Sequence, residues 1–356
     1  MKKKLSLLLA LTLVLGGCSS QKAPVSQPPA PSGDPAVQAS TPAAQEPVDL
    51  VFATMDVGTA IYTYSSAIAN LLSDYLPAGS TVDLPTTSPG GLGAAYLTAD
   101  GKSDLIILND VGALESLRSG VLGQPAIGEG KVCGLVGSLD MPHVDVLVRN
   151  DFISKTGCES MEDLVAKKIP ADFVIKQAGT MGELAFVQLV DALGTTEEEM
   201  LGWGCTITRT STGNIKTAMQ DGTADITVDH PPDNQANTVE LTMNTPCTLW
   251  PLSENVRDYM EGKGWTKTVW AAGTSGFTGH DKDIETVSSS NVVVCRADLD
   301  EETAYQITKA ICENKEALAN TSSALKVFEP ENAWITLKDI LHPGAVRYYT
   351  EMGYMK

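Results

Sequence analysis

The sequence predicts a two-lobe α/β protein. Short apolar runs typical of buried strands alternate with segments whose apolar residues recur three or four positions apart, as in helices. Repeated strand–helix–strand units of this kind indicate an α/β architecture with mainly parallel sheets. The chain from Val48 to Lys356 has just over 300 residues, more than a single hydrophobic core usually organises, so we expect two lobes.

The individual elements follow from the same periodicity. Ile61, Ile68 and Leu72, for example, lie on one face of a helix, whereas the run DLIIL from Asp104 to Leu108 is typical of a buried strand. In the first half we expect strand 49–54, helix 61–76, strand 81–85, helix 92–98, and strands 104–108, 132–139 and 144–148. In the second half we expect helix 160–166, strand 172–175, helix 183–193, strand 205–209, helix 215–220, strands 225–228 and 292–295, and helix 301–318.

The first eighteen residues predict export. Three lysines precede an apolar run from Leu5 to Leu15, which is too short to span a bilayer and is typical of a secretory signal. The closing Leu15-Gly16-Gly17-Cys18 resembles a bacterial lipobox. We therefore expect residues 1–17 to be removed and Cys18 to be lipidated, anchoring the protein to the outer face of the cell membrane or its periplasmic side. An ordinary cleaved signal beside a chance cysteine is the alternative.

Residues 18–47 predict a tether. The segment after Cys18 is rich in Pro, Ala, Ser and Gln and has almost no large apolar residue, so it cannot bury a core. We expect it to hold the folded body away from the membrane, with Cys18 as the protein's only contact with the lipid bilayer.

The charge of the chain excludes one class of partner. The net charge is −19, and removal of the three signal-segment lysines takes it to −22. Bulk charge of this sign does not attract nucleic acid or an anionic membrane surface. We therefore expect no nucleic-acid partner, and an anionic ligand would need a local positive site.

Six cysteines follow Cys18, and none lies at a zinc-ligand spacing. No C-x-x-C or mixed Cys/His pattern occurs among them. An exported chain can hold disulfides, but several of these cysteines lie in apolar strand-like runs, which favours free buried thiols. Both states stay open from the sequence. The six are Cys133, Cys158, Cys205, Cys247, Cys295 and Cys312.

Motifs of catalysis are scarce. The chain has no G-x-S-x-G, H-E-x-x-H or Walker motif, and none of its four histidines has a second histidine at ligand spacing. We therefore expect a protein that is not an enzyme and has no cofactor and no metal. Asp229 and His230 as an acid–base pair of an extracellular enzyme remain the catalytic alternative.

Three loop-to-helix junctions are the candidate binding elements. They lie at 54–59, 86–91 and 178–182, each between an expected strand and an expected helix. Such junctions meet at the carboxyl ends of strands, where free backbone N–H groups and the helix dipole can hold a carboxylate. Simple helix capping is the alternative for each. The candidate residues are Asp56, Gly58, Thr59, Ser88, Gly90, Gly179, Thr180 and Met181.

The C-terminal segment carries the most specific motif, His342-Pro343-Gly344-Ala345-Val346-Arg347-Tyr348-Tyr349. It resembles the H-P-G-A-x-R-Y-Y ending of the TAXI family of solute receptors, which serve TRAP (tripartite ATP-independent periplasmic) transporters. Cys295-Arg296-Ala297-Asp298-Leu299 resembles its strand and R-A-D-L turn. Gly179 and Glu183 fit its G-S-G-T-E junction, and Ala53-Thr54 with Gly58 and Tyr62 fits its glycine-rich opening. The resemblance is weak but covers nearly the whole mature body.

The departures from the TAXI pattern concentrate where that resemblance places the ligand. Met55-Asp56-Val57 replaces Gly-Gly-Thr, and Met181 replaces a glycine. Asn109-Asp110 stands in a shortened Q-S-D-V segment, and Asp229-His230 begins a segment that replaces a small T-A-G-like stretch. TAXI receptors are associated with acidic amino acids and 2-oxo acids. Asp56 and Asp229, if both face the cleft, argue against simple transfer of that ligand class and could hold an ammonium group.

Arg209 and Tyr62 complete the candidate site. Arg209 ends an expected strand just before Thr210-Ser211-Thr212-Gly213, so we expect it to pair with a ligand carboxylate. A solvated surface arginine is the alternative. Tyr62 could place its ring along the ligand or pack in the core.

The resemblance implies a periplasmic-binding-protein type II-like fold with a hinge of two crossing strands. Lobe 1 would comprise residues 48–145 plus 294–356, and lobe 2 residues 146–293. A small organic solute, a carboxylate or an amino acid, would bind between the lobes and favour closure. The closed receptor would deliver the solute to a TRAP-type membrane permease. A binding protein of an ABC importer, or a sensor on the same fold, remains the alternative.

Overall fold

The computed structural model describes residues 46–55, 57 and 59–355. These residues belong to one compact unit, Gln45–Lys356. The expected signal segment, Cys18 and most of the tether lie outside the described residues, as do Asp56 and Gly58. Within the described part of the chain, no helix is long and apolar enough to cross a membrane.

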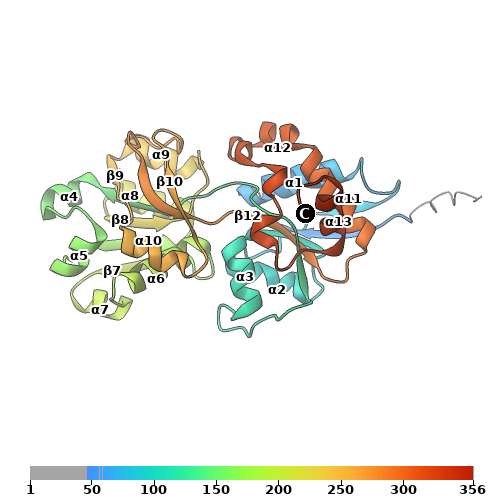
Figure 1. Cartoon of the computed structure of the whole chain (residues 1–356). Helices are drawn as coiled ribbons and strands as arrows, with labels where there is room; N and C mark the ends of the chain where they lie inside the picture. Colours follow the sequence, from blue (N-terminus) through green and yellow to red (C-terminus); the bar gives the residue numbers. More distant parts are fainter. Residues whose placement is uncertain (1–45, 56, 58, 356) are drawn as a thin grey trace, which may run out of the picture. The chain divides into compact units, whose positions relative to one another are not determined.

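The first lobe is built on a five-stranded sheet of order β2-β1-β3-β12-β4. In Figure 1 it is the part of the folded body that carries the label β12 and the C-terminus. Its strands are β1 (Asp49–Ala53), β2 (Thr81–Asp83), β3 (Leu105–Asn109), β4 (Val132–Val136) and β12 (Asn291–Arg296). Its helices are α1 (Ala60–Leu72), α2 (Ala94–Ala99), α3 (Asp110–Arg118), α11 (Glu301–Glu313), α12 (Lys315–Thr321) and α13 (Pro343–Glu351), with 3-10 turns η1 (Gly91–Gly93), η2 (Ser323–Val327), η3 (Pro330–Asn332) and η4 (Ile335–Leu337).

The second lobe repeats this plan with a sheet of order β7-β6-β8-β5-β9. Its strands are β5 (Asp145–Arg149), β6 (Asp172–Lys176), β7 (Thr206–Thr210), β8 (Ile226–Asp229) and β9 (Cys247–Leu249), and a separate antiparallel ribbon is formed by β10 (Thr266–Trp270) and β11 (Ile284–Ser288). Its helices are α4 (Asn150–Thr156), α5 (Met161–Lys167), α6 (Met181–Ala192), α7 (Glu197–Gly202), α8 (Thr212–Asp221), α9 (Ala236–Asn244) and α10 (Glu254–Glu261).

Each sheet contains one reversed strand. β12 is antiparallel to both β3 and β4, and β5 is antiparallel to both β8 and β9, whereas the other pairings are parallel. The expectation of mainly parallel sheets therefore holds for four strands in each sheet. The reversed strand in each sheet is the one that the chain enters directly from the other lobe.

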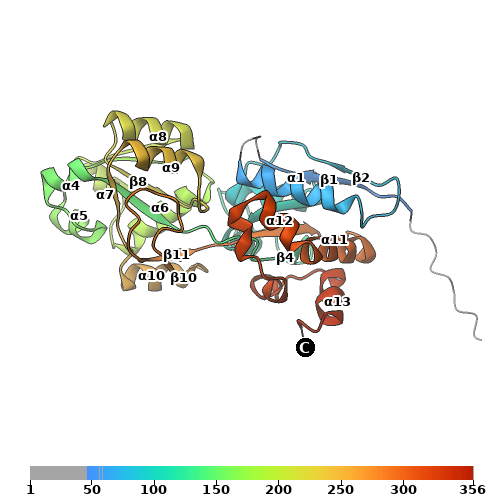
Figure 2. The same ribbon diagram turned by 90° about the horizontal axis from the view of Figure 1, so that it is seen from above.

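Two extended segments connect the lobes and run side by side. His143 forms an antiparallel bridge with Ser288, and Leu139 N–H donates to Asn291 O at 3.0 Å. The buried Asp140 carboxylate accepts from both the backbone and the side-chain N–H groups of Asn291, at 2.8–3.0 Å. Burial raises the pKa of Asp140 to about 6. The hinge thus consists of two tied strands that cross between the sheets (Figure 2).

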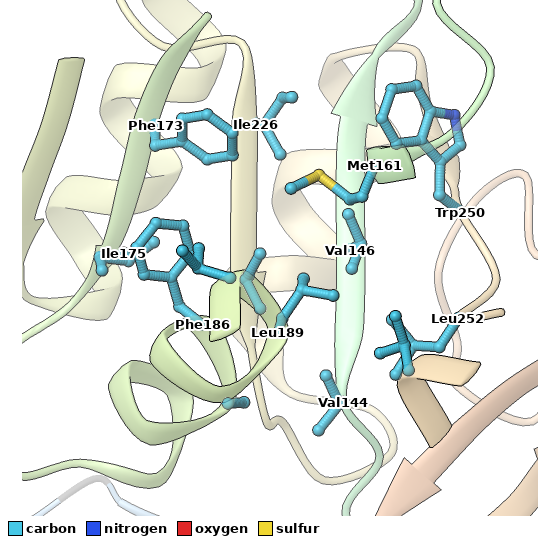
Figure 3. Close-up of a cluster of buried hydrophobic side chains, with 14 of the residues drawn as sticks. Val144, Val146, Met161, Phe173, Ile175, Phe186, Leu189, Ile226, Trp250 and Leu252 are labelled. Atoms are coloured by element: carbon cyan, nitrogen blue, oxygen red, sulfur yellow. The ribbon is translucent and has the colours of Figure 1, made fainter. Parts of the chain in front are cut away.

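The strand alternation divides the core of the second lobe between the two faces of its sheet. Phe173 and Ile175 of β6 pack with Phe186 and Leu189 of α6 on one face (Figure 3). Val174, between them in sequence, joins the opposite cluster against α8 and α9. Full burial of one such side chain contributes about 1.5–3 kcal/mol. Which face a residue takes also decides whether it reaches the candidate site.

The C-terminal His-Pro-Gly motif has a packing role. His342 caps α13, since its Nδ1 accepts from Gly344 N–H at 3.2 Å. A Cβ atom at Gly344 would lie 2.2 Å from Glu301 O and 2.7 Å from Tyr305 N, so only glycine allows α13 to approach α11 this closely. The motif fixes the outer layer of the first lobe, away from the candidate site.

The structure differs from the sequence expectations in the bounds of two helices and in several elements that lie between the predicted ones. The expected helix 301–318 is divided at Asn314 into α11 and α12, and the helix expected to reach Leu76 ends at Leu72. Helices α3, α4, α7, α9, α10 and α13 and strands β9, β10 and β11 were not anticipated. All six cysteines in the described part of the chain are free thiols, five of them buried.

Candidate functional site

A cavity of about 420 Å³ lies between the two lobes. The first lobe lines it with the start of α1, Gly91 of η1, the end of β3 and Asn291. The second lobe lines it with Lys176, the starts of α6 and α8, and the segment after β8. Because both lobes contribute, a ligand in this cavity would touch both.

Helix N-termini surround the cavity. α1 begins beside it after Thr59, α6 after Thr180 and α8 after Ser211. Thr59 Oγ1 accepts from Tyr62 N–H and Thr180 Oγ1 accepts from Glu183 N–H, so these two helices are capped by their own side chains. Ser211 makes no side-chain cap hydrogen bond to α8. The first N–H groups of α8 therefore face the cavity without that competitor, and the positive end of a ten-residue helix favours an anion there.

Lys176 lies beside this helix start. Its Nζ donates to Thr212 Oγ1, the first residue of α8. It is the only Lys or Arg side chain among the described residues that line the cavity. An ammonium group next to an open helix N-terminus is a suitable site for one carboxylate.

Asp229 brings a negative group to the same face of the sheet. Phe173 of β6 pairs with Ile226 of β8 in parallel register, so Lys176 and Asp229 lie three residues further along each strand. A Cβ atom at Gly182 would lie 2.3 Å from Asp229 Oδ1 and 2.7 Å from Lys176 Cγ. Gly182 therefore lets the start of α6 approach both groups closely. The cavity wall presents a cation and a carboxylate on neighbouring strands.

Asp145 continues this row behind the cavity. It pairs with Asp229 in the antiparallel β5–β8 register, and its Oδ1 accepts Asp229 N–H at 2.9 Å. Its side chain is buried. Burial first, and then the neighbouring Asp229 charge, raise the pKa of Asp145 well above its usual value, whereas Lys176 opposes the shift. The row Lys176–Asp229–Asp145 is thus electrostatically connected.

A direct contact joins the lobes at one side of the cavity. Leu92 N–H of the first lobe donates to Gly179 O of the second at 2.9 Å. Gly91 has φ +51°, and a Cβ atom there would lie 2.4 Å from Gly179 O and 2.9 Å from Thr180 Cα. The approach of the two lobes at this point requires glycine at position 91.

The structure brings together half of the sequence-predicted residues that it describes. Those lining the cavity are Thr59, Asn109, Thr180, Met181, Asp229 and His230. Those outside its lining are Tyr62, Ser88, Gly90, Asp110, Gly179 and Arg209. Three residues of the latter set have structural contacts near the cavity. Ser88 Oγ accepts from Gly90 N–H, and Gly179 O accepts the hydrogen bond that joins the two lobes.

Asp110 is a hinge residue in this structure. Its Oδ1 accepts from Ser289 Oγ and from Val111 N–H, both at 2.7 Å, and its backbone N–H donates to Ser290 O at 2.9 Å. Burial raises its pKa to about 6. These bonds fix the start of α3 to the segment between β11 and β12, which explains its position outside the cavity lining.

Arg209 is committed to two carboxylates of its own lobe. Its guanidinium pairs with Glu197 at 2.5 Å and with Glu183 at 3.1 Å. Arg209 lies opposite Ile175 in the β6–β7 register, which places it on the α6 face of the sheet. Arg209, expected from the sequence as the cation of the cleft, is therefore not among the described residues that line the cavity, whereas Lys176, one residue further along β6 than Ile175, is.

Three buried histidines gather at the hinge. His230 Nε2 accepts Ser289 N–H at 3.3 Å, and His280 Nδ1 lies 2.7 Å from Ser275 Oγ. His143 stacks on Trp270 with ring centroids 4.8 Å apart, and its Nδ1 has no hydrogen-bond partner among the described residues. Burial lowers the pKa of His230 to about 3, and burial with a smaller effect of His280 lowers that of His143 to about 4.

His143→Phe is expected to improve stability in acid. The folded-state pKa of about 4 lies below the unfolded value, so the unfolded chain takes up the proton first as pH falls. As the pH falls from about 6.5 to about 4, His143 therefore lowers the free energy of unfolding, by roughly 2 kcal/mol at about pH 5. Phenylalanine keeps the stack on Trp270 and does not titrate. Urea unfolding at about pH 7 and pH 5 measures the free energy of unfolding of the variant and of the parent protein. If both proteins lose the same amount of stability between the two pH values, the prediction is contradicted.

The sequence reasoning did not select Lys176, Ser211 or Thr212 as site residues, and it included Gly182 only as the last residue of the 178–182 junction. The sequence did offer a signal for these residues. Lys176 ends a strand just before the third junction, and Ser211 and Thr212 follow the strand that contains Arg209. No group of three or more His, Cys, Asp or Glu side chains in the described part of the chain is placed to hold a metal ion.

A family model described as the NMT1-like family matches residues 52–353. The chain belongs to the NMT1-like family. No curated protein matches the chain. Apart from the first three residues of β1, the match includes both sheets, and it includes every residue named above in the cavity wall.

Other proteins of known structure have the same fold as this NMT1-like protein. MatC from Rhodopseudomonas palustris with bound malate is 17% identical, with a TM-score of 0.53 over 86% of this chain and 99% of that one. The periplasmic binding protein BugD is 15% identical, with a TM-score of 0.50 over 87% and 98%. PhnD1 from Prochlorococcus marinus in complex with methylphosphonate is 10% identical, with a TM-score of 0.50 over 87% and 100%. The expected two-lobe periplasmic-binding-protein type II-like fold is confirmed.

Proposed function

We propose that this NMT1-like protein is a solute receptor that captures a small organic carboxylate between its two lobes. The open N-terminus of α8 beside Lys176 carries the proposal, because together they can neutralise and hydrogen-bond one carboxylate within a strongly acidic protein. Malate bound to MatC, a protein of the same fold, is a carboxylate and supports this ligand class.

Asp229 narrows the solute class. It lies on the strand next to Lys176, so a solute whose carboxylate reaches Lys176 also approaches a negative group. A hydroxyl or ammonium donor beside the carboxylate would satisfy Asp229, whereas a second carboxylate at that point would be repelled. We therefore favour hydroxy acids and amino acids over solutes with a carboxylate at both positions.

Binding would act through the hinge. A solute that contacts both lobes favours the closed state, because only that state provides both sets of contacts. The lobe boundaries proposed are residues 48–145 plus 294–356 and residues 146–293. The closed form would then deliver the solute to a TRAP-type permease, as the TAXI-like motifs suggest, with Cys18 as a lipid anchor outside the cytoplasm. Delivery to an ABC importer remains the alternative, and no covalent step is needed.

A thermal-shift screen tests the proposal. Hydroxy acids, amino acids, 2-oxo acids and dicarboxylates would each be added to the purified protein, because a ligand that binds the folded state raises Tm by mass action. Calorimetry on the best hit gives its affinity. We expect a carboxylate to give the largest shift without being consumed. Absence of any carboxylate effect, or turnover of the hit, would overturn the receptor proposal.

A further inference from the structure

A second, much smaller cavity lies behind the solute cleft. It lies between the second sheet and helices α8 and α9 and is partly open. Its lining includes Asp145, Thr212, Lys216, Thr227, Asp229 and Thr238. Its volume of about 10 Å³, measured as room for the centre of a water molecule, admits one water-sized occupant. Asp229 lines both this cavity and the solute cleft.

Thr227 points to an occupant. Its side chain is 3% exposed, and its Oγ1 has no hydrogen-bond partner among the described residues. Thr227 and Asp229 are two positions apart on β8 and so share a face, and Asp145 lies opposite Asp229 on β5. A buried hydroxyl without a partner costs about 1–3 kcal/mol, which a ligand for its oxygen would offset.

The other atoms that could coordinate an occupant of this cavity are oxygens. Asp145 uses Oδ1 for Asp229 N–H, and Asp229 uses Oδ1 for His230 N–H, so each carboxyl keeps a second oxygen. Thr238 Oγ1 donates its proton to Gln235 Oε1 and can still accept or coordinate. Carboxylate and hydroxyl oxygens are the ligands of hard cations, and no thiol or imidazole lines this cavity.

Charge selects a monovalent ion. The charged residues that line the cavity are Asp145 on β5, Asp229 on β8 and Lys216 of α8, and Lys216 is paired with Glu240 of α9 at 2.7 Å. The Lys176 ammonium on β6 does not line the cavity but acts on Asp145 electrostatically. Two carboxylates and the Lys176 ammonium leave one net negative charge. One positive charge neutralises it, whereas a divalent ion would leave a buried excess of positive charge.

We propose that this cavity binds one small monovalent cation of the size of sodium, held by Asp145, Asp229 and Thr227. Bound there, the cation offsets the Asp229 charge on the far side from the cleft. A carboxylate solute then meets less repulsion, so solute and cation would each increase the affinity of the other. This coupling rests on the proposed function, but cation binding itself does not.

The primary experiment is carried out without any solute. Tm of the purified protein is measured in NaCl, KCl and choline chloride at equal ionic strength. We expect a saturable rise with sodium, roughly 5 °C when the site is filled well above its Kd, and a smaller or no rise with potassium and choline.

Thr227→Val identifies the site. Thr227→Val keeps the shape of the side chain but removes the coordinating oxygen, so the sodium response should weaken at least tenfold while Tm in choline is unchanged or higher. Thr98→Val is the matched control, because Thr98 Oγ1 is also buried without a partner but lies on α2 in the first lobe. Its sodium response should equal that of the parent protein.

The outcomes separate the possible occupants. Equal Tm in all three salts would overturn the proposal and indicate water, or a proton on Asp145. A sodium effect that survives in Thr227→Val would place the ion elsewhere and also overturn it. The solute screen is repeated in choline chloride: a sodium response without any solute hit overturns the proposed function alone, and a solute hit that ignores sodium overturns the coupling.

Discussion

Lys176→Met is expected to weaken binding of the carboxylate solute by roughly 30- to 150-fold, because losing a charged hydrogen bond costs about 2–3 kcal/mol. Lys176 is the only Lys or Arg side chain among the described residues that line the cleft. Methionine keeps the length of the side chain and removes the charge. Calorimetric titration with the solute found in the screen measures the change, and unfolding curves show whether the fold is retained.

Arg209→Met is the matched control for this prediction. Arg209 ends the neighbouring strand but is held by Glu183 and Glu197 on the other face of the sheet. We expect its affinity for the solute to stay within about threefold of the parent protein, although its stability will fall slightly. A large loss in Arg209→Met together with a small one in Lys176→Met would place the carboxylate on the α6 face and contradict the proposed site.

Gly91→Ala is expected to weaken solute binding about tenfold or more by holding the lobes apart. The new Cβ would meet Gly179 O at 2.4 Å and Thr180 Cα at 2.9 Å, and both are backbone atoms that cannot turn away as a side chain can. The lobes must separate locally, which removes contacts that a bound solute needs from both sides. Calorimetry gives the affinity, and small-angle X-ray scattering shows whether solute still makes the protein more compact.

Gly101→Ala separates this steric effect from backbone strain. Gly101 also has a positive φ, +69°, in the first lobe, but nothing lies within 4 Å of the Cβ it would gain. Both substitutions carry the conformational cost of a left-handed alanine, about 1–2 kcal/mol, and only Gly91→Ala adds the clash. If the two variants bind the solute equally well, the Gly91–Gly179 contact is not part of the ligand-bound state.

Much of the scaffold could be predicted from local pattern. The apolar runs of β1, β3, β5 and β12 are short and continuous because these strands are buried on both faces, so the sequence signals them clearly. Helices such as α4, α7 and α10 were missed because they are short and mostly exposed, and few apolar residues mark their periodicity. The direction of each strand in its sheet could not be predicted from the local sequence pattern either, because a reversed strand has the same kind of apolar run.

The candidate site shows the same division. Thr180, Met181 and Asp229 were predicted because strand–helix junctions meet at one edge of an α/β sheet, a rule that needs only element order. Arg209 was selected and Lys176 was not, because both lie at the ends of neighbouring strands and only the strand register decides which face each side chain takes. A shift of one position exchanges the two faces.

The sequence by itself determined the α/β class, the two-lobe organisation and the helix starts at which a ligand can bind, because these depend on periodicity, length and the order of elements. The tertiary structure alone decided which cation faces the cleft, that Gly91 meets Gly179, and that Asp145 and Thr227 line a water-sized space behind Asp229. These features join residues far apart in the chain. Their positions follow from strand register and lobe contact, which no local pattern encodes.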